Sequence, residues 1–549
     1  MSYVIGMDFG TLSGRAIVVN AETGEEVGTG VMDYPHGVID RELAGKKLPP
    51  DFALQDPQDY LDVMRHAIPA AIKDAGIDPS EIKGIGLDHT SATVLVTTED
   101  GTPLNQLEEF QDNPHAWIKL WKHHGGQEQA DRIVALAEER NEEWLGRYGG
   151  VLSSELLMPK ALETLEKAPE VFKAAVHIVN ALDWIPWQLT GTLAYAEGDS
   201  GYKRQYQDGA YPSKEYLTAL NPDFANVFEE KMPAPIVPLG AAVGTLTPQW
   251  AKELGLGEDV TVASGNIDAH VTATAVKAVE PGQLTGILGT SVCWVVSGED
   301  YKEVPGTFGI VHGGIVPGYW GFEGGQTAVG DIFAWFVENS VPAHYQAEAD
   351  EKGVSLHELL TDKAASQEVG EHGLLALDWH NGNRSILADA NLSGMILGQT
   401  LTTTAEDQYR ALQEACVFGA RRIIENFEEH GVAITEIVGA GGLLKNEFLM
   451  QLYADITRRP LSVATSSQAP ALGAAIYAAV AAGIYPDVFA ASEAMGGKEE
   501  NKYTPDEERA AKYDKLYAEY VKLHDYFGKG GNEVMHTLKQ IRREATEGK

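Results

Sequence analysis

The sequence predicts an α/β protein built from two large domains of similar topology. Its 549 residues exceed the roughly 250–300 that one hydrophobic core supports, so we expect at least two domains. Strand and helix patterns alternate along the chain without a low-complexity linker. One pattern, a strand, a Gly-Thr turn and a second strand, occurs in "MDFGTLSGRAIVV" near the N-terminus and again in "LGTSVCWVV" in the second half. This repetition favours two domains of one plan.

The charge of the chain restricts its partners. Composition is that of an ordinary globular protein, with 44% hydrophobic and 22% charged residues, but the formal net charge is −38. Such a surface repels polyphosphate backbones and anionic lipid, so we expect neither a nucleic-acid nor a membrane partner. An anionic substrate would need a local positive site or a metal ion.

Cysteine usage indicates a reducing compartment. The chain has two cysteines, Cys293 and Cys416, and no CxxC pair. We therefore expect neither a disulfide framework nor a structural zinc site. The start "MSYVIGMDFG" lacks a basic region, and no stretch of about 18 apolar residues occurs, so we expect no signal peptide or membrane span and a cytoplasmic location.

The first half opens with a predicted β-hairpin. Residues 3–7 and 15–20 are β-rich runs, and 21–24 read as a turn. Because strands flank "DFGTLSG" on both sides, it differs from the strand-to-helix turn of a nucleotide-binding βαβ unit. Residues 58–75 have the apolar spacing of a helix, and 82–87 form a buried strand that leads into "DHTSATVLV".

The second half repeats the hairpin and then adds helices. Residues 283–288 and 292–297 are strands around a Gly-Thr-Ser turn, and 436–440 form a further strand. Asn446 is placed to cap the helix that follows. Residues 469–482, "APALGAAIYAAVAA", predict a helix whose small side chains let another backbone approach closely.

The C-terminal tail predicts a further helix. Residues 504–507, "TPDE", have the pattern of a capping box with proline at the first helical position, so we expect the helix to begin there. Tyr513, Leu516, Tyr517 and Tyr520 then form a stripe at helical spacing, which we interpret as core packing.

Several common chemical motifs are absent from the sequence. It contains no GxxxxGK[ST] loop, no HExxH and no EF-hand loop, and "GAGGLL" is an incomplete GxGxxG. The histidines, including the pair His123-His124, lack metal-ligand spacing. The chain is therefore not a P-loop enzyme, and no histidine-based metal site is predicted.

The first hairpin carries the strongest chemical signal, the pattern D-x-G-T-x-x-x-R. Gly10 lets the backbone approach a phosphate oxygen, and Thr11 and Ser13 offer hydroxyl donors. Arg15 can neutralise phosphate charge through its planar fork, or it can be a surface ion pair. Asp8 would repel a bare phosphate, but it would suit a magnesium ion, which takes few carboxylates and keeps its waters.

Two further segments carry weaker signals. Asp268 in "SGNIDAHVTATA" lies between an apolar strand and an alanine-rich helix, so it is either a helix cap or an acid at a domain boundary. Gly441-Gly442 ends a strand, and without side chains it would let a flat base or ribose lie against the backbone.

Together these segments resemble the FGGY carbohydrate kinase family, within the actin–hexokinase–heat-shock-ATPase superfamily. The ordered set is "MDFGTLSGR", "GNIDAH", "LGTS" and "GAGGLLKN", and the resemblance covers nearly the whole chain. "DWIPWQLTG" and "EGGQTAVGDIFAW" look most like the bacterial branch of the family that acts on L-ribulose in L-arabinose catabolism. Glycerol kinases differ at the positions of Phe9 and Leu12.

The resemblance implies two actin-like (ribonuclease H-like) α/β domains, each a mixed sheet flanked by helices, with a deep interdomain cleft. We expect an N-terminal sugar-binding domain at 1–258, a C-terminal ATP-binding domain at 259–495 and a helical extension at 496–549. Closure of the cleft is expected, because water admitted there would compete for the phosphoryl group.

The resemblance also implies roles for individual residues. Asp268 matches the catalytic base that takes the proton of the terminal sugar hydroxyl, and Asp8 would hold Mg²⁺. The ATP contacts are expected at Thr11, Ser13, Arg15, Gly289 and Thr290 for the phosphates and at Gly441, Gly442 and Asn446 for adenosine. The sugar contacts are expected at Thr93, Trp121, Lys203, Asp268 and Glu323, where lysine and glutamate would supply both donors and acceptors.

The implied activity is ATP-dependent phosphorylation of a ketopentose, L-ribulose, to its 5-phosphate. A xylulose, glycerol or other polyol kinase of the same family is the alternative, and a non-enzymatic actin-like ATP-binding protein is a more remote one. Many family members read the sugar with a Trp-acid-Arg trio, and "FQDNPHAWIKLWK" departs from it, so that contact set does not carry over. A homodimer is left open.

Overall fold

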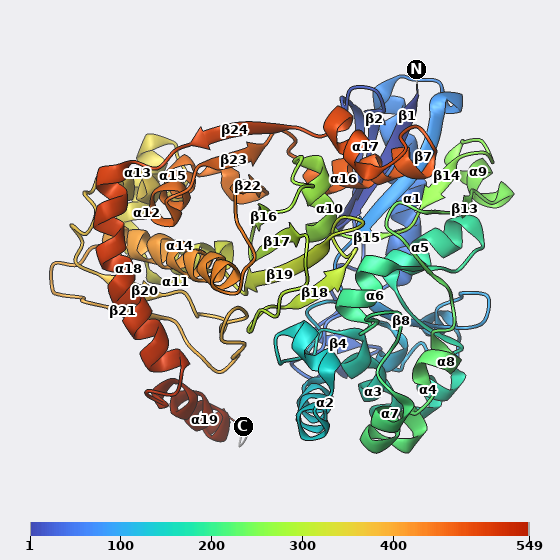
Figure 1. The fold of residues 1–549 in the computed structure, drawn as a ribbon, viewed down its shortest axis with the longest axis horizontal. Coiled ribbons are helices and arrows are strands. Elements are labelled where there is room, and N and C mark those ends of the chain that lie inside the picture. The colour runs from blue at the N-terminus through green and yellow to red at the C-terminus, as the bar shows by residue number, and fades with distance from the viewer. Residues whose placement is uncertain (1, 547–549) are drawn as a thin grey trace.

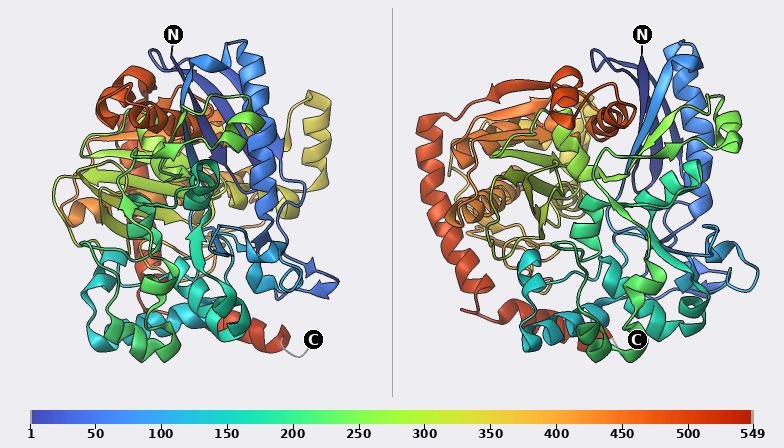
Figure 2. Two further views of the ribbon diagram at one scale, coloured as in Figure 1. Left: turned by 90° about the vertical axis from the view of Figure 1, so that its right-hand side faces the viewer. Right: turned by 45° about the vertical axis from the view of Figure 1, so that its right-hand side comes forward.

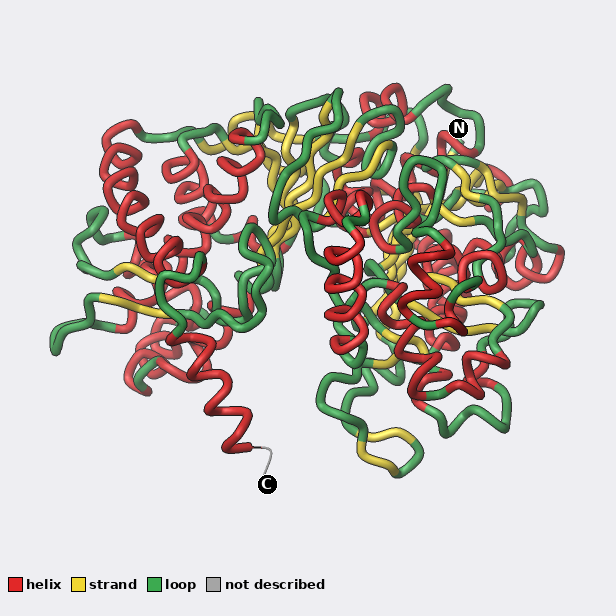
Figure 3. Tube along the Cα trace, turned by 60° about the horizontal axis from the view of Figure 1, so that its bottom comes forward, coloured by secondary structure: helices red, strands yellow, loops and turns green. Residues whose placement is uncertain are grey.

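Two seven-stranded mixed sheets organise residues 2–546, which are the residues that the computed structural model describes (Figure 1). Helices flank the strands in both halves of the molecule (Figure 3). Among residues 2–546, no helix combines the length and apolar character needed to cross a membrane.

The first sheet has the strand order β13-β14-β7-β1-β2-β3. Strands β1, β2 and β3 form an antiparallel meander. Strand β7 runs parallel to β1, and β14 runs parallel to β7. The short strand β15 continues the pairing along β7. The strands are β1 Tyr3–Phe9, β2 Ser13–Asn20, β3 Glu26–Asp33, β7 Ile82–His89, β13 Ala242–Thr245, β14 Thr261–Ala263 and β15 Asn266–Ile267.

The second sheet repeats this plan. Its strands β16, β17 and β19 are antiparallel neighbours, β22 runs parallel to β16, and β23 runs parallel to β22. Strands β18 and β24 extend the two edges. The strands are β16 Gln283–Leu288, β17 Val292–Gly298, β18 Gly309–His312, β19 Trp320–Gln326, β22 Glu436–Ala440, β23 Leu461–Ala464 and β24 Lys498–Tyr503. The prediction of two α/β units of one topology, opening on matching hairpins, is confirmed.

The first unit, which we define by the first sheet, also contains a four-stranded sheet of order β10-β8-β9-β6. Helices α2, α3, α4, α7 and α8 gather at the end of this unit opposite the N-terminus (Figures 1 and 2). Its helices are α1 Pro57–Ala75, α2 Gln127–Arg140, α3 Leu157–Lys167, α4 Pro169–Ala174, α5 Ala181–Thr190, α6 Glu197–Lys203, α7 Lys214–Leu220, α8 Val227–Lys231, α9 Pro248–Leu254 and α10 Asp268–Ala275. Its remaining strands are β4 Glu42–Leu43, β5 Lys46–Lys47, β6 Leu54–Gln55, β8 Val94–Thr97, β9 Ile118–Lys119, β10 His177–Asn180, β11 Tyr195–Ala196 and β12 Ile236–Val237.

The second unit, defined by the second sheet, carries the long helix α14 against its core. Its helices are α11 Gly330–Ser340, α12 Ala343–Lys352, α13 Leu356–Ala365, α14 Ala405–Glu429 and α15 Glu447–Thr457, with the short strands β20 Leu375–Leu377 and β21 Met395–Leu397. Asn446 accepts a hydrogen bond from the Leu449 amide at 3.0 Å, so its predicted capping role is confirmed.

Helix α16, Ala469–Ala481, follows the second sheet in the chain but lies on the first one (Figure 1). The contact is between backbones: a Cβ on Gly6 would lie 1.9 Å from the Ala471 carbonyl oxygen, and one on Gly86 would lie 2.0 Å from that of Ala474. The glycines of the strands and the alanines of the helix together permit this approach, as the composition of the helix predicted.

Helix α10 is held on the other side of α16 in the same way. A Cβ on Gly473 of α16 would lie 2.2 Å from the Val271 carbonyl oxygen of α10. Helix α17, Val488–Met495, completes this group, and Ser492 donates to the Thr274 carbonyl at 2.6 Å. Helices α16 and α17, which follow β23 in the chain, thereby hold the helix that begins at Asp268 in place.

The tail forms α18, Glu507–Gly528, and α19, Val534–Thr546. The prediction of a capping box starting at Thr504 is wrong: Asp506 is the cap and accepts from the Glu508 and Arg509 amides at 3.0 and 2.9 Å. Asp506 is favoured because its own amide is already bonded to the buried Asp455 carboxylate at 2.8 Å.

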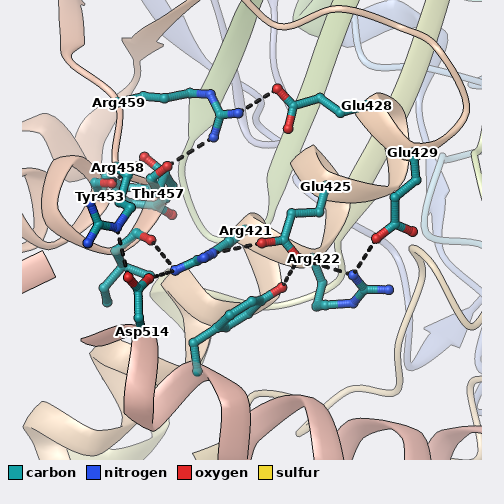
Figure 4. A network of polar contacts seen from close by, with 12 residues as sticks. Arg421, Arg422, Glu425, Glu428, Glu429, Tyr453, Thr457, Arg458, Arg459 and Asp514 are labelled. Atoms are coloured by element: carbon teal, nitrogen blue, oxygen red, sulfur yellow. Dashed lines mark hydrogen bonds and ion pairs between the residues drawn. The ribbon is translucent and has the colours of Figure 1, made fainter. Parts of the chain in front are cut away.

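Ion pairs dock α18 against the second unit (Figure 4). Arg421 of α14 and Arg458 after α15 both reach Asp514 of α18, at 2.7 and 2.8 Å. Arg421 also pairs with Glu425 at 2.8 Å. Single exposed pairs contribute little, but these share partners and surround an apolar stripe that includes Tyr513 and Tyr520. The stripe is core packing, as predicted.

The backbone contact of α16 makes Gly6 a sensitive position. A methyl group there meets backbone atoms that cannot rotate away, so α16 must shift, and we expect Gly6→Ala to lower the free energy of unfolding by about 1–3 kcal/mol. The measurement is the unfolding temperature in calorimetry. Gly146→Ala is the control, because its nearest neighbour would be Glu303 Oε1 at 3.8 Å. Equal unfolding temperatures for the two variants would contradict the packing argument.

Candidate active site

Three carboxylates gather at one edge of the first sheet. Asp8 is near the end of β1, Asp88 is near the end of β7, and the two residues are register partners. Asn266 of β15 is the partner of Asp88 on the other side, two residues before Asp268. Because the carboxyl ends of neighbouring parallel strands meet at one edge, the topology brings these side chains together.

Asp268 is the first residue of α10, and the N-cap position is held by Ile267, which makes no side-chain capping hydrogen bond. Its Oδ1 accepts a hydrogen bond from the Ala269 amide at 2.7 Å. Burial, followed by the negative charge of Asp8, raises the pKa of Asp268 to about 7, and the Ala269 amide opposes this shift only in part. A carboxyl group with such a pKa can take up a proton near neutral pH.

Asp88 is a site residue that the sequence does not single out. Its side chain is fully buried, and neither oxygen has a conventional donor. Burial raises the pKa of Asp88 well above its ordinary value, and the charges of Asp8 and Asp268 add to the effect. The sequence signal for Asp88 is its place near the end of the buried strand "IKGIGLDH", which pairs in parallel with the strand that carries Asp8.

The first Gly-Thr hairpin closes tightly, and its side chains contact Asp8 and Trp121. The Gly10 amide donates to the Ser13 carbonyl at 3.0 Å, which leaves Leu12 exposed at the tip. Arg15 Nε lies 3.3 Å from Asp8 Oδ2, so both readings of Arg15 stay open, as an ion-pair partner and as a phosphate ligand. Trp121 Nε1 donates to Thr11 Oγ1 at 3.1 Å, which links the indole to the hairpin.

The second Gly-Thr hairpin lies beside the paired glycines. The Gly289 amide donates to the Ser291 carbonyl at 3.1 Å, and the Thr290 carbonyl accepts from the Val329 amide at 2.8 Å. Gly441 has a φ of +105°, and a Cβ there would lie 2.6 Å from the Leu288 carbonyl oxygen, so only glycine fits. A Cβ on Gly442 would meet nothing within 4 Å, so its backbone faces open space.

Lys203 and Glu323 join the two units through a buried ion pair. Lys203 Nζ, on α6, lies 3.1 Å from a carboxylate oxygen of Glu323, on β19. His270 Nε2 lies 2.9 Å from the same carboxylate. Burial by itself would raise the pKa of Glu323, but Lys203 and His270 outweigh it and lower the pKa to about 2. The sequence did not single out His270, two residues after Asp268.

Thr93 is a buried predicted sugar contact, as Lys203 is. Its side chain is buried, and its hydroxyl lies 3.0 Å from the hydroxyl of Thr90 in the same turn. The turn itself is held by Lys160, whose Nζ donates to the Ala92 and Leu120 carbonyls at 2.7 Å each. This buried lysine therefore positions the segments that carry Thr93 and Trp121.

A cavity of about 580 Å³ opens between the two units. Trp121 and Glu155 line it from the first unit, and Thr290, Ser291 and Arg384 line it from the second. The cavity thus has phosphate-type turn residues on one wall and an aromatic side chain bonded to the first hairpin on the other. Arg384 is a further residue that the sequence did not single out.

Two sheets of one topology, each with a Gly-Thr hairpin, and a cavity between them define a two-domain α/β class of protein. Models of the FGGY family of carbohydrate kinases match this chain, the N-terminal domain over residues 3–275 and the C-terminal domain over residues 284–482. The chain belongs to the FGGY family of carbohydrate kinases, as its resemblance implied.

Curated relatives match over nearly the full length. A protein named ribulokinase from Mycolicibacterium smegmatis is 55% identical over 546 residues, which are 99% of this chain and 97% of the relative. A ribulokinase from Geobacillus thermodenitrificans is 46% identical over 556 residues, covering 100% and 98% of the two chains. A ribulokinase from Staphylococcus aureus strain Newman is 38% identical over 545 residues, covering 99% and 100%.

Solved structures share the fold. A xylulose kinase from Lactobacillus acidophilus superposes with a TM-score of 0.77 at 20% identity, covering 96% of this chain and 98% of the other. A glycerol kinase from Plasmodium falciparum has a TM-score of 0.74 at 16% identity, covering 95% and 98%. At these identities the likeness shows the fold alone, and it confirms the predicted two-domain α/β architecture.

The raised pKa of Asp268 makes stability depend on pH. Its pKa is about 7 in the folded protein and near 3.8 in an unfolded chain, so the folded state binds the proton more tightly. The stability that this proton contributes is lost as pH rises from about 4 to about 7. We expect Asp268→Asn to unfold at a higher temperature than the native protein at pH 8, with little difference at pH 4.

Glu323→Gln is the matched control, and its effect on stability should have the opposite sign. The pKa of Glu323 is lowered in the folded protein, so its ionised form, paired with Lys203, stabilises the fold at pH values above the ordinary pKa of a glutamate. That variant should unfold at a lower temperature than the native protein at pH 8. An Asp268→Asn variant that is less stable than native at pH 8 would contradict the electrostatic account of this site.

Proposed function

We propose that this chain is an ATP-dependent ribulokinase that converts L-ribulose to L-ribulose 5-phosphate in L-arabinose catabolism. The observation that carries the reaction is Asp268, a carboxyl group with a pKa of about 7 at the edge of the first sheet where Asp8 and Asp88 also lie. The choice of sugar is supported by relatives named ribulokinase at 38–55% identity over nearly the whole chain.

In the proposed reaction, Asp268 accepts the proton of the terminal sugar hydroxyl while that oxygen attacks the γ-phosphorus of ATP. The bond between the γ-phosphorus and the ADP oxygen breaks, and ADP leaves with the electron pair. The hydrogen bond from Ala269 orients the carboxylate, and burial together with the charge of Asp8 keeps the pKa of Asp268 high enough to take the proton. A positioned base of this kind contributes roughly 10²–10⁴-fold.

The two hairpins supply the proposed phosphate contacts. Thr11, Ser13 and Arg15 come from the first unit and Gly289 and Thr290 from the second, so the phosphates would bridge the cavity. For adenosine we propose Gly441, Gly442 and Asn446. Support comes from the register of Ala440 with Ile287, which places the paired glycines next to the second hairpin, and from the open space over Gly442.

The carboxylates at the edge of the first sheet fit a magnesium ion. Both oxygens of Asp88 lack a conventional donor, and Asp8 stands beside it. Among residues 2–546, no group of three or more histidine, cysteine, aspartate or glutamate side chains is arranged as a metal cage. This suits magnesium, which takes one or two carboxylates and completes its shell with water and substrate phosphate. When bound at Asp8, the ion would neutralise charge on the phosphates.

The sugar would lie against Lys203, Glu323 and Trp121, with Thr93 behind them. Lys203 donates and Glu323 accepts, and the fixed pair between them sets the spacing of hydroxyl groups that can bind. Trp121, held by Thr11, supplies an apolar face next to the phosphate hairpin. The free thiols of Cys293 and Cys416 suit the reducing cytoplasm, where we place the reaction.

A substrate panel tests the proposed function. We expect kcat/KM for L-ribulose to exceed that for D-xylulose, D-ribulose, ribitol and glycerol under the same ATP and magnesium concentrations. The reason is that a fixed donor–acceptor pair rejects hydroxyl arrangements that leave its buried charges unpaired. A higher kcat/KM for D-xylulose or glycerol would make the chain a different kinase of the family.

Asp268→Ala tests the proposed base. We expect kcat to fall roughly 10²–10⁴-fold while ATP still binds, as measured by calorimetric titration. Asp223→Ala is the control. It removes an exposed carboxylate just after α7, outside the proposed site, and should leave kcat unchanged. Unchanged sugar phosphorylation by Asp268→Ala would refute the mechanism, whereas ATP binding without any sugar phosphorylation by the native protein would favour a non-enzymatic ATP-binding role.

A further inference from the structure

Arg384 brings positive charge to a cavity in a strongly acidic protein. The formal net charge of the chain is −38, so its field opposes anionic substrates and products. Among the described residues that line the cavity between the two units, the lysines and arginines are Lys122 and Arg384. Of these, Arg384 lies on the wall that also carries Thr290 and Ser291.

The backbone around Arg384 runs beside β19 and fixes where the side chain lies. Ser385 donates from its amide to the Gly325 carbonyl and accepts at Oγ from the Gly325 amide, both at 3.1 Å. A Cβ on Gly325 would lie 3.6 Å from Cδ and from Nη1 of Arg384. The guanidinium group therefore lies over the bare backbone of Gly325, where any larger side chain would contact it.

The register of the second sheet places Gly325 between the two parts of the site. Gly325 pairs with Cys293 of β17, and Cys293 is two residues after Ser291 of the phosphate hairpin. Glu323, the carboxylate of the sugar side, precedes Gly325 by two residues on β19, so both project toward the same face of the sheet. Arg384 therefore lies between the phosphate hairpin and the proposed sugar contact.

Two contacts hold the guanidinium group, and one of them can be exchanged. Its Cζ lies 5.1 Å from the centre of the Phe308 ring, and Lys203 Nζ lies 4.7 Å from that centre. Across the cavity, Nη2 lies 3.4 Å from Oε1 of Glu155 in the first unit. This distance is long for a charge-assisted hydrogen bond, so a phosphoryl oxygen can replace Glu155 at little cost.

We propose that Arg384 is a catalytic residue that binds the phosphoryl group while it passes from ATP to the sugar. The inference rests on the function proposed above. The sugar oxygen forms the new bond to phosphorus, the bond to the ADP oxygen breaks, and the proton goes to Asp268. The planar fork of the Arg384 guanidinium group pairs with two oxygens of the transferring group, releasing Glu155.

Arg384→Ala tests this role. We expect kcat to fall about 10²-fold or more, because a preorganised donor for developing charge is lost. Calorimetric titration should give nearly native dissociation constants for L-ribulose and for ATP, since the contact is made mainly in the transition state. Added guanidinium ion should restore part of kcat in Arg384→Ala. Rescue is the decisive readout, because a purely structural arginine would not respond to it.

Two control variants separate catalysis from other roles. Arg65→Ala removes an arginine that also stacks on an aromatic ring, Trp250 at 5.0 Å, and should retain native kcat with no response to guanidinium. Glu155→Gln removes only the partner across the cavity. If Arg384 merely ties the units together, Glu155→Gln will lose as much kcat as Arg384→Ala, and that result would overturn the proposal. A kcat for Glu155→Gln within about threefold of native supports it.

The same assays distinguish the two levels of the proposal. No phosphorylation of any sugar by the native enzyme would refute the proposed function itself. Native activity that Asp268→Ala abolishes and Arg384→Ala leaves intact would refute only the role of Arg384. Should Arg384→Ala fail to fold by calorimetry, Arg384→Lys keeps the charge without the fork, and native kcat in that variant would overturn a bidentate contact.

Discussion

The approach of α16 to the first sheet is the contact on which the rest of the structure depends. The backbones meet because Gly6 and Gly86 lack side chains, and the facing helix residues are alanines. A helix encoded after the second sheet thus becomes part of the layer over the first. Since α10 packs on α16 in turn, the position of Asp268 relative to both sheets follows from this backbone contact rather than from loops.

The electrostatics of the site are a consequence of that geometry. Parallel pairing of β1, β7 and β15 brings Asp8, Asp88 and Asp268 to one edge, where burial raises the pKa of all three and neighbouring carboxylates further raise the pKa of Asp88 and Asp268. On β19 of the second sheet, Glu323 is held in its ionised form by Lys203 and His270. The site therefore combines Asp268, a carboxyl group whose pKa lies near neutrality, with Glu323, a carboxyl group that stays charged.

Residues whose role depends on neighbours in the chain could be predicted from the sequence. Residues whose role depends on strand pairing or on a contact distant in sequence could not. Asn446 and both Gly-Thr hairpins were read from spacing, because caps and turns depend on neighbours in the chain. Asp88 was missed because its importance comes from lying beside Asp8 in the sheet, and His270 because it acts through Glu323, 53 residues away. The Thr504 cap was wrong because Asp455, distant in sequence, binds the Asp506 amide and favours the later start.

By itself, the sequence determined that the chain is a two-unit α/β protein with paired phosphate-type hairpins, and its ordered motifs indicated the FGGY carbohydrate kinases. These features are local, so periodicity, turn chemistry and motif order carry them. Only the tertiary structure decided which charges meet between the two units: Lys203 with Glu323, and Arg384 with Glu155 across the cavity. Such pairs join residues from different strands and units, and their energies depend on burial and distance, which become defined only when the two sheets face each other.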